Sequence, residues 1–162
     1  MFKRHSALFV SAAAFLLFTP GLLAQTLQVI NADGKTTLLT AAQIAGAAHV
    51  TLNVRDHDIP AQFEGVPLSA LLPLAGILLG ASLHGPRLTE ALLVEATDGY
   101  KVVFALAELD PDFATREIIL ADKRDGKPLG EKEGPFRIVA PGDKRPARWI
   151  RQITTLKIVA VK

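Results

Sequence analysis

The sequence predicts an α+β domain in which short strands form a strand-dominated mixed sheet with short helices between them. Two observations support this prediction. Short segments rich in Val, Ile, Leu and Thr recur between turn residues, and the apolar stretches with helical spacing that separate them are brief. The chain shows no internal repeat, low-complexity tract or linker, so we expect a single domain.

Residues 1–24 predict a secretory signal peptide. A positively charged start precedes an apolar run at 7–18, the run breaks at Pro20-Gly21, and Ala24 places a small residue at the expected cleavage point. The apolar run is too short for a comfortable membrane span, and an uncleaved anchor is the alternative. Cleavage would leave residues 25–162 as one periplasmic domain that does not itself span the membrane.

The charge of the mature chain is balanced overall but uneven along its length. Without Lys3 and Arg4, the 18 basic residues fall to 16 and equal the 16 acidic ones. A net charge of zero argues against a nucleic-acid binder, which needs excess positive charge. The 26 residues from Arg137 onward nevertheless carry seven positive residues and one acid, Asp143, a net of +6. The composition therefore leaves room for a local anion site.

The sequence contains no cysteine. Exported proteins often rely on disulfides, and this chain has none. Thiolate catalysis and Cys-ligated metals are also excluded for these 162 residues.

The first segments of the mature chain predict a hairpin followed by a helix. Thr26–Ile30 and Thr36–Leu39 are strand-like and are separated by turn residues at 31–34. Thr40 is positioned to cap a helix at 41–45, which Gly46 ends.

Residues 49–54 alternate as a strand does, and we expect 55–58 to be a charged, mobile link. His57 between two aspartates invites a metal site. Neighbouring side chains on an extended chain point to opposite faces, however, so the three do not converge easily on one ion.

The middle of the chain predicts one helix and a long connection. A strand end and turn at 61–68 lead into a helix from Pro67 to Ala75. Its apolar residues fall at helical spacing and predict a core stripe of Leu68, Leu71, Leu72 and Ala75. Residues 76–87 are rich in Gly and Pro and predict an irregular connection.

The second half begins with the best-determined hairpin, in which Asp98-Gly99 joins strands at 90–97 and 100–104. A short helix at 105–109 follows. The turn at 122–128 lacks the alternating oxygen ligands of a calcium loop, so we expect no calcium there. Three further strands are expected, at 117–121, 136–139 and 152–161.

The segment Gly134–Arg151, GPFRIVAPGDKRPARWIR, is the strongest candidate for a binding site. Arginines surround the only tryptophan, Trp149, and an aromatic ring among guanidinium groups suits a flat, polar or anionic ligand. Arg148 and Arg151 lie three apart and would share a side of a helical turn, but would diverge on a strand. Arg137 is expected to be buried or half-buried. The alternative is a solvated basic face with Trp149 closing the core and Arg137 paired with a core carboxylate.

An ordered set of motifs carries a resemblance to a known family. It comprises Phe63–Leu68, Leu71-Leu72, Ala75-Gly76, Ala96–Tyr100, Leu106, Glu108-Leu109, Ile119–Ala121, Gly134–Val139 and Arg148–Ile150. In order and spacing this set resembles the molybdopterin-binding domain of the sulfite oxidase family, in its small exported form. The resemblance covers residues 48–160 and implies the sulfite oxidase fold.

This sequence departs from the family at one chemically decisive point. The family's enzymes bind molybdenum through a pterin dithiolene and one cysteine, which lies before the Gly-x-Pro-Leu motif. The matching stretch here is 50–62, VTLNVRDHDIPAQ, which offers no thiolate and no equivalent soft ligand. The resemblance therefore leaves enzyme activity in doubt, leans against it, and makes molybdenum an unexpected ligand.

The cysteine-less chain is similar to periplasmic pterin-binding proteins that signal to a membrane-bound sensor controlling cyclic di-GMP turnover. That resemblance implies a reduced pterin or molybdopterin-like ligand. Trp149 would then stack on the pterin, and Arg148, Arg151 and Arg137 would meet its polar groups. Asp143 and Asp98 are candidate acceptors for the amino-pyrimidine edge, and Tyr100 could supply a hydroxyl. Turn formation is the alternative for both aspartates, and core packing is the alternative for Tyr100.

Two other functions remain open at this point. One is a molybdopterin-dependent oxidoreductase with atypical metal ligation. The other is an adaptor whose basic C-terminal face binds an acidic protein and no small ligand. A phosphate on the ligand would find partners in Lys144 and Arg145. Hydrolysis has no support, because no recognisable motif joins Ser, His and Asp.

Overall fold

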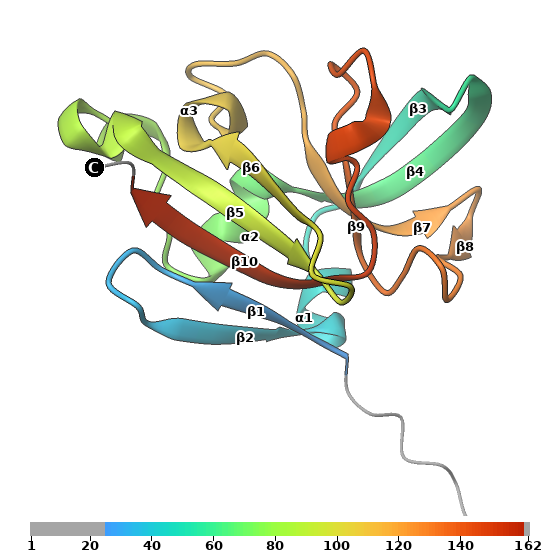
Figure 1. Cartoon of the computed structure of the whole chain (residues 1–162), viewed down its shortest axis with the longest axis horizontal. Coiled ribbons are helices and arrows are strands. Elements are labelled where there is room, and N and C mark those ends of the chain that lie inside the picture. The colour runs from blue at the N-terminus through green and yellow to red at the C-terminus, as the bar shows by residue number, and fades with distance from the viewer. Residues whose placement is uncertain (1–24, 161–162) are drawn as a thin grey trace, which may run out of the picture.

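A computed structural model describes residues 25–160. The predicted signal peptide, residues 1–24, lies outside the described residues. The strands form two five-stranded sheets (Figure 1). The predicted fold class is therefore confirmed as α+β and strand-dominated, with the strands divided between two sheets.

The first sheet is mixed and has the order β2-β1-β10-β5-β6. Its central strand β10 (Ile153–Ala160) runs parallel to β1 (Thr26–Ile30) and antiparallel to β5 (Glu90–Ala96). The edge strands are β2 (Thr36–Thr40) and β6 (Lys101–Ala105). The last strand of the chain thus joins the N-terminal hairpin to the β5–β6 hairpin.

The second sheet is antiparallel. It contains β3 (Val50–Asp56), β4 (Ile59–Pro67), β7 (Ile119–Arg124) and β8 (Lys127–Pro128) in that order, and β9 (Arg137–Val139) also pairs with β7. Gly65 in β4 packs so closely on the backbone of β7 that a β-carbon there would overlap the carbonyl of Leu120. This close packing explains why position 65 is a glycine.

Short helices follow three of the strands. Thr40 caps α1 (Ala41–Ala45) through a reciprocal bond pair with Gln43, at 3.2 Å and 2.9 Å. Helix α2 (Leu68–Leu74) continues from β4 and buries the predicted stripe of Leu68, Leu71, Leu72 and Ala75. Helix α3 (Leu106–Leu109) follows β6.

Within residues 25–160, three short 3-10 helices occupy the connections. The helices η1 (Gly80–Ser82) and η2 (Gly85–Thr89) lie in the connection that was expected to be irregular. The third, η3 (Pro146–Arg148), lies in the segment Gly134–Arg151, called the Trp/Arg segment below. Because η3 ends at Arg148, it does not include Arg151.

The expectation of a mobile charged link at 55–58 is wrong. Strand β3 extends to Asp56 and pairs with Ile59, so His57 and Asp58 form a tight hairpin turn. Both residues have positive φ, 50° and 68°, and the Arg55 guanidinium donates to the Asp58 carbonyl at 2.7 Å. Such a turn normally favours Asn and Gly. Because His57 and Asp58 occupy it here, the sequence carried no signal for a hairpin turn.

The turn expected at 122–128 is also shorter than predicted. Strand β7 continues to Arg124, and only Asp125-Gly126 turns before β8. The stretch at 61–68, expected to be a strand end and a turn, is instead the main part of β4, which runs to Pro67 and leads directly into α2. The remaining predicted strands and helices are confirmed, with ends that shift by one or two residues.

Candidate functional site

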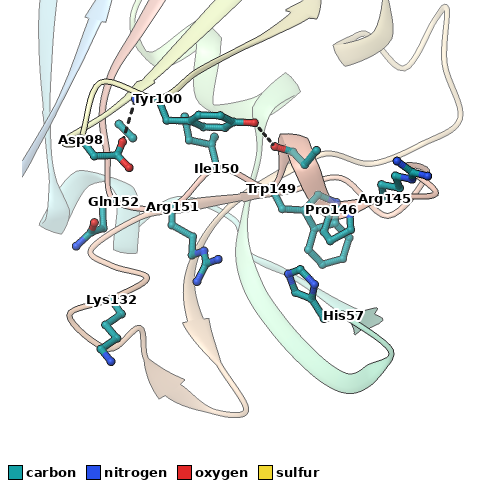
Figure 2. A pocket seen from close by; sticks show the side chains of 12 residues that line it. His57, Asp98, Tyr100, Lys132, Arg145, Pro146, Trp149, Ile150, Arg151 and Gln152 are labelled. Carbon is teal, nitrogen blue, oxygen red and sulfur yellow. Dashed lines mark hydrogen bonds between the residues drawn. The ribbon is translucent and has the colours of Figure 1, made fainter.

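Four segments distant in the sequence border one pocket of about 580 Å³. They are the β3–β4 turn, the β5–β6 turn, the loop before β9, and the chain from Arg145 to Gln152. Figure 2 shows the side chains of His57, Ala96, Asp98, Tyr100, Lys132, Arg145, Pro146, Ala147, Trp149, Ile150, Arg151 and Gln152 around it. A second pocket, of about 540 Å³, is lined by none of the seven residues that the sequence predicted.

The pocket carries an excess of positive charge with one negative group. Lys132, Arg145 and Arg151 are its cations, and within the described part of the chain Asp98 is the single acid that lines it. This combination suits a ligand with an anionic group and a separate hydrogen-bond donor edge.

The structure brings four of the seven predicted residues to this pocket: Asp98, Tyr100, Trp149 and Arg151. Arg137, Asp143 and Arg148 do not line it. Their predicted part in ligand binding stays a prediction, and their contacts give each of them another role.

Arg137 is buried in an ion network beside Trp149, which lines the pocket. Its Nη1 lies 3.2 Å from Asp56 Oδ2 and 2.6 Å from Glu133 Oε1, and Arg124 contacts the same two carboxylates at 3.3 Å and 3.1 Å. Burial lowers the pKa of Arg137, and the two carboxylates partly offset that effect. Arg137 therefore has the alternative role that its sequence context suggested, pairing with a core carboxylate.

Trp149 mainly fills the core beside that network. Trp149 is only 5% exposed, and its indole Nε1 donates to the Ala140 carbonyl at 2.8 Å. The ring meets Phe63 edge-on, with centroids 6.3 Å apart, and the Arg137 guanidinium lies over both rings. Only part of the indole is left to face the pocket, so the alternative in which Trp149 closes the core describes its position.

Arg148 is hydrogen-bonded to two carboxylates outside the pocket. Its Nη2 and Nε donate to Asp143 at 2.7 Å and 2.9 Å, and its Nη1 donates to Glu108 at 3.0 Å. The hydrogen bonds with Asp143 are the largest cause that raises the pKa of Arg148. Arg148 and Arg151 therefore do not share a side, because the helical turn that this required stops at Arg148.

Asp98 and Tyr100 occupy the rim as an exposed pair. Asp98 Oδ1 accepts a bond from the Tyr100 backbone at 2.9 Å, which is the turn role weighed as its alternative. Tyr100 is not in the core: it is 51% exposed, and its hydroxyl donates to the Ala147 carbonyl at 3.1 Å (Figure 2). A fixed and accessible aromatic ring thus lies beside a carboxylate.

Three polar pocket residues were not predicted as parts of a site: His57, Lys132 and Gln152. His57 was considered only as a metal ligand, and no pattern marked the other two. His57 and Gln152 are two of the four non-glycine residues with positive φ in the described chain, at 50° and 52°. Backbone strain of this kind concentrates at functional sites, which supports this pocket as the candidate site.

The pocket offers no thiolate, the protein ligand that binds molybdenum in the enzymes of the family that the sequence resembles. The stretch at 50–62, which matches the family's cysteine segment, forms β3, the turn and part of β4. His57 from this stretch lines the pocket, and Asp56 lies in the buried ion network. Asp56 is already paired with two arginines, and residues 25–160 contain no group of three or more His, Cys, Asp or Glu that could hold a metal ion. The pocket itself offers a carboxylate, a tyrosine ring and three cations.

Comparison with known proteins supports the fold and leaves the function open. No family model matches the sequence, and no curated protein matches it. A solved structure, the sulfane dehydrogenase SoxCD from Paracoccus pantotrophus, is similar with a TM-score of 0.63 and 20% sequence identity. The match covers 84% of this chain and 39% of that chain, so this chain spans about two fifths of its structural neighbour. This chain shares the fold of the matched part of that structure.

No helix in the described part of the chain is both long enough and apolar enough to cross a membrane.

Proposed function

We propose that the protein binds a pterin in the pocket beside Tyr100 and has no catalytic activity of its own. The ligand is a reduced pterin or a molybdopterin-like compound. The observation that carries this proposal is the pocket itself, in which one carboxylate, one exposed aromatic ring and three cations meet. The fold shared with a sulfane dehydrogenase component supports it at a coarser level.

Each part of a pterin has a chemically matched partner among the lining residues. Asp98 accepts from the amino group and ring N–H of the pyrimidinone edge, as an ionised carboxylate can. Tyr100 offers its ring for stacking. Arg151 donates to the carbonyl edge, and Lys132 and Arg145 neutralise an anionic tail such as a phosphate.

The absence of cysteine supports a binding role without redox chemistry. This chain cannot supply the thiolate that completes the molybdenum site in the family it resembles, and a carboxylate or imidazole is not an equivalent soft ligand. The activity named for the structural neighbour is therefore not transferred to this protein.

The same proposal includes where the protein acts and on what. The signal-like residues 1–24 support export to the periplasm. There the loaded protein contacts a membrane-bound sensor of cyclic di-GMP metabolism and reports that pterin is present. A binding protein without catalytic groups needs such a partner to produce a response.

The decisive experiment analyses what the protein carries when it is purified. The full chain is expressed with its own N-terminal segment, recovered anaerobically, denatured and oxidised, and the released compounds are examined for pterin fluorescence while molybdenum is measured in parallel. We expect pterin without stoichiometric molybdenum. Pterin with stoichiometric molybdenum would support the oxidoreductase instead. No pterin, even after incubation with reduced pterins, would overturn the proposal and leave the adaptor.

A further inference from the structure

Gln152 joins the segments that carry three of the pocket's charged residues. Its backbone N–H donates to the Glu133 carbonyl at 3.0 Å, and its side-chain Nε2 donates to the Glu131 carbonyl at 2.7 Å. These two bonds therefore hold the residues directly before and after Lys132. A loop held at both neighbours of one residue has little freedom at that residue.

The carbonyl of Gln152 holds a different segment. It accepts from the Thr97 backbone N–H at 3.0 Å and from the Thr97 hydroxyl at 2.9 Å. Thr97 directly precedes Asp98, and Arg151 directly precedes Gln152. Figure 2 shows Asp98, Arg151, Lys132 and Gln152 together at one end of the pocket.

Gln152 makes these contacts from a strained backbone. Its φ is 52°, in the left-handed region that glycine and asparagine adopt more easily than glutamine. Glycine would remove the strain but also the side-chain bond to the Glu131 carbonyl. The strained backbone of Gln152 is thus found together with its side-chain bond to the Glu131 carbonyl, which glycine could not make.

We propose that Gln152 is a positioning residue, which fixes Lys132 toward the anionic part of the ligand through its bond to the loop at 131–133. The inference rests on the proposed function for the identity of the ligand. The loop restraint itself requires no ligand, so it can be tested separately.

The first test is amide hydrogen exchange of the ligand-free protein. Gln152→Ala removes the side-chain bond and keeps the backbone bonds, and Gln152→Glu keeps the length but removes the donor. Loss of one hydrogen bond of ordinary net strength predicts about fivefold faster exchange in 130–134 for both variants. The matched control is Gln62→Ala on strand β4, whose side chain bonds Asn53 at 3.2 Å and should leave 130–134 unchanged. Unchanged exchange in both Gln152 variants would overturn the inference.

The second test is a double-mutant cycle on ligand affinity. The probes are dihydroneopterin and its phosphate monoester, a matched pair with and without the anion. If Gln152 acts through Lys132, Gln152→Ala and Lys132→Met should each weaken binding of the phosphate ester by about tenfold and should weaken it no further together. Tyr100→Ala combined with Gln152→Ala should give additive losses, since Tyr100 would contact the pterin ring and not the phosphate.

The outcomes separate this inference from the proposed function. If neither probe binds and the purified protein carries no pterin, the proposed function fails, and the exchange experiment alone decides the role of Gln152. If the probes bind but the losses from Gln152→Ala and Lys132→Met add, the function stands and the positioning role is refuted. An equal loss for both probes would also refute it, because a general structural effect does not distinguish the phosphate.

Discussion

Arg137 and Asp56, 81 residues apart in the sequence, form a buried ion pair at 3.2 Å between β9 and the end of β3. Both residues are less than a tenth exposed. The pair joins the end of the β3–β4 hairpin to β9, the strand at the start of the Trp/Arg segment. It thereby fixes two borders of the pocket relative to each other.

Asp56→Ala should strongly destabilise the fold, because it leaves Arg137 buried beside only one remaining carboxylate. Breaking a buried pair on one side costs about 3–5 kcal/mol, and denaturant unfolding would measure it. The matched control is Glu95→Gln, which breaks the exposed pair with Lys101 at 2.8 Å and should cost less than about 1 kcal/mol. A similar small loss for both variants would mean that water reaches Arg137.

Substitution of Tyr100 should mainly weaken ligand binding, whereas substitution of Trp149 should mainly lower the stability of the fold. Tyr100→Ala removes an exposed ring and should weaken pterin binding by about tenfold, the effect of losing one stacking partner, at a stability cost below about 1 kcal/mol. Trp149→Ala empties a core position and should cost about 3–5 kcal/mol of stability. Calorimetric titration and chemical unfolding on both variants would test this. A large affinity loss in Trp149→Phe, which retains a core aromatic ring, would return the stacking role to Trp149.

Local signals in the sequence predicted those parts of the fold that depend on neighbouring residues. Thr40 caps α1 and Asp98-Gly99 turns between strands because both effects act over a few residues. The division into two sheets was not predicted, since it depends on pairings such as Gln28 with Thr155. The apolar pattern of a strand identifies a buried face but does not identify its partner.

The candidate site was predicted in part for the same reason. Composition pointed to the Trp/Arg segment, and the segment does border the pocket. Whether Arg148 or Arg151 faces the pocket depends on where η3 ends, and a single 3-10 turn leaves no periodicity in the sequence. Lys132 was missed because its loop is hydrogen-bonded, at Glu131 and Glu133, to Gln152, which lies in a later segment of the chain.

Asp98→Asn should test the role of charge at the pocket without disturbing the turn. Asparagine keeps the side-chain oxygen that accepts the Tyr100 backbone N–H and suits the Asn-Gly turn. Loss of the carboxylate should weaken pterin binding by about tenfold or more, since hydrogen bonds to charged groups are the stronger ones. Asp33→Asn is the matched control, because Asp33 Oδ1 accepts the Lys35 N–H at 2.9 Å in the same way, away from the pocket. Equal affinity in all three proteins would remove Asp98 from the binding site.

Arg148→Met should mainly lower stability and Arg151→Met should mainly weaken ligand binding, although both remove a guanidinium from the same segment. Arg148 holds Asp143 and Glu108, so its loss should cost about 1–3 kcal/mol of stability, as expected for hydrogen bonds between charged groups. Its ligand affinity should stay close to that of the wild type. Arg151 lines the pocket, so its loss should weaken ligand binding by about tenfold at little cost in stability. Unfolding and titration of the two variants side by side would check the assignment. The reverse pattern would move the site to the Arg148 side of the segment, and a loss of affinity in both would indicate that the whole basic face, and not this pocket, binds the ligand.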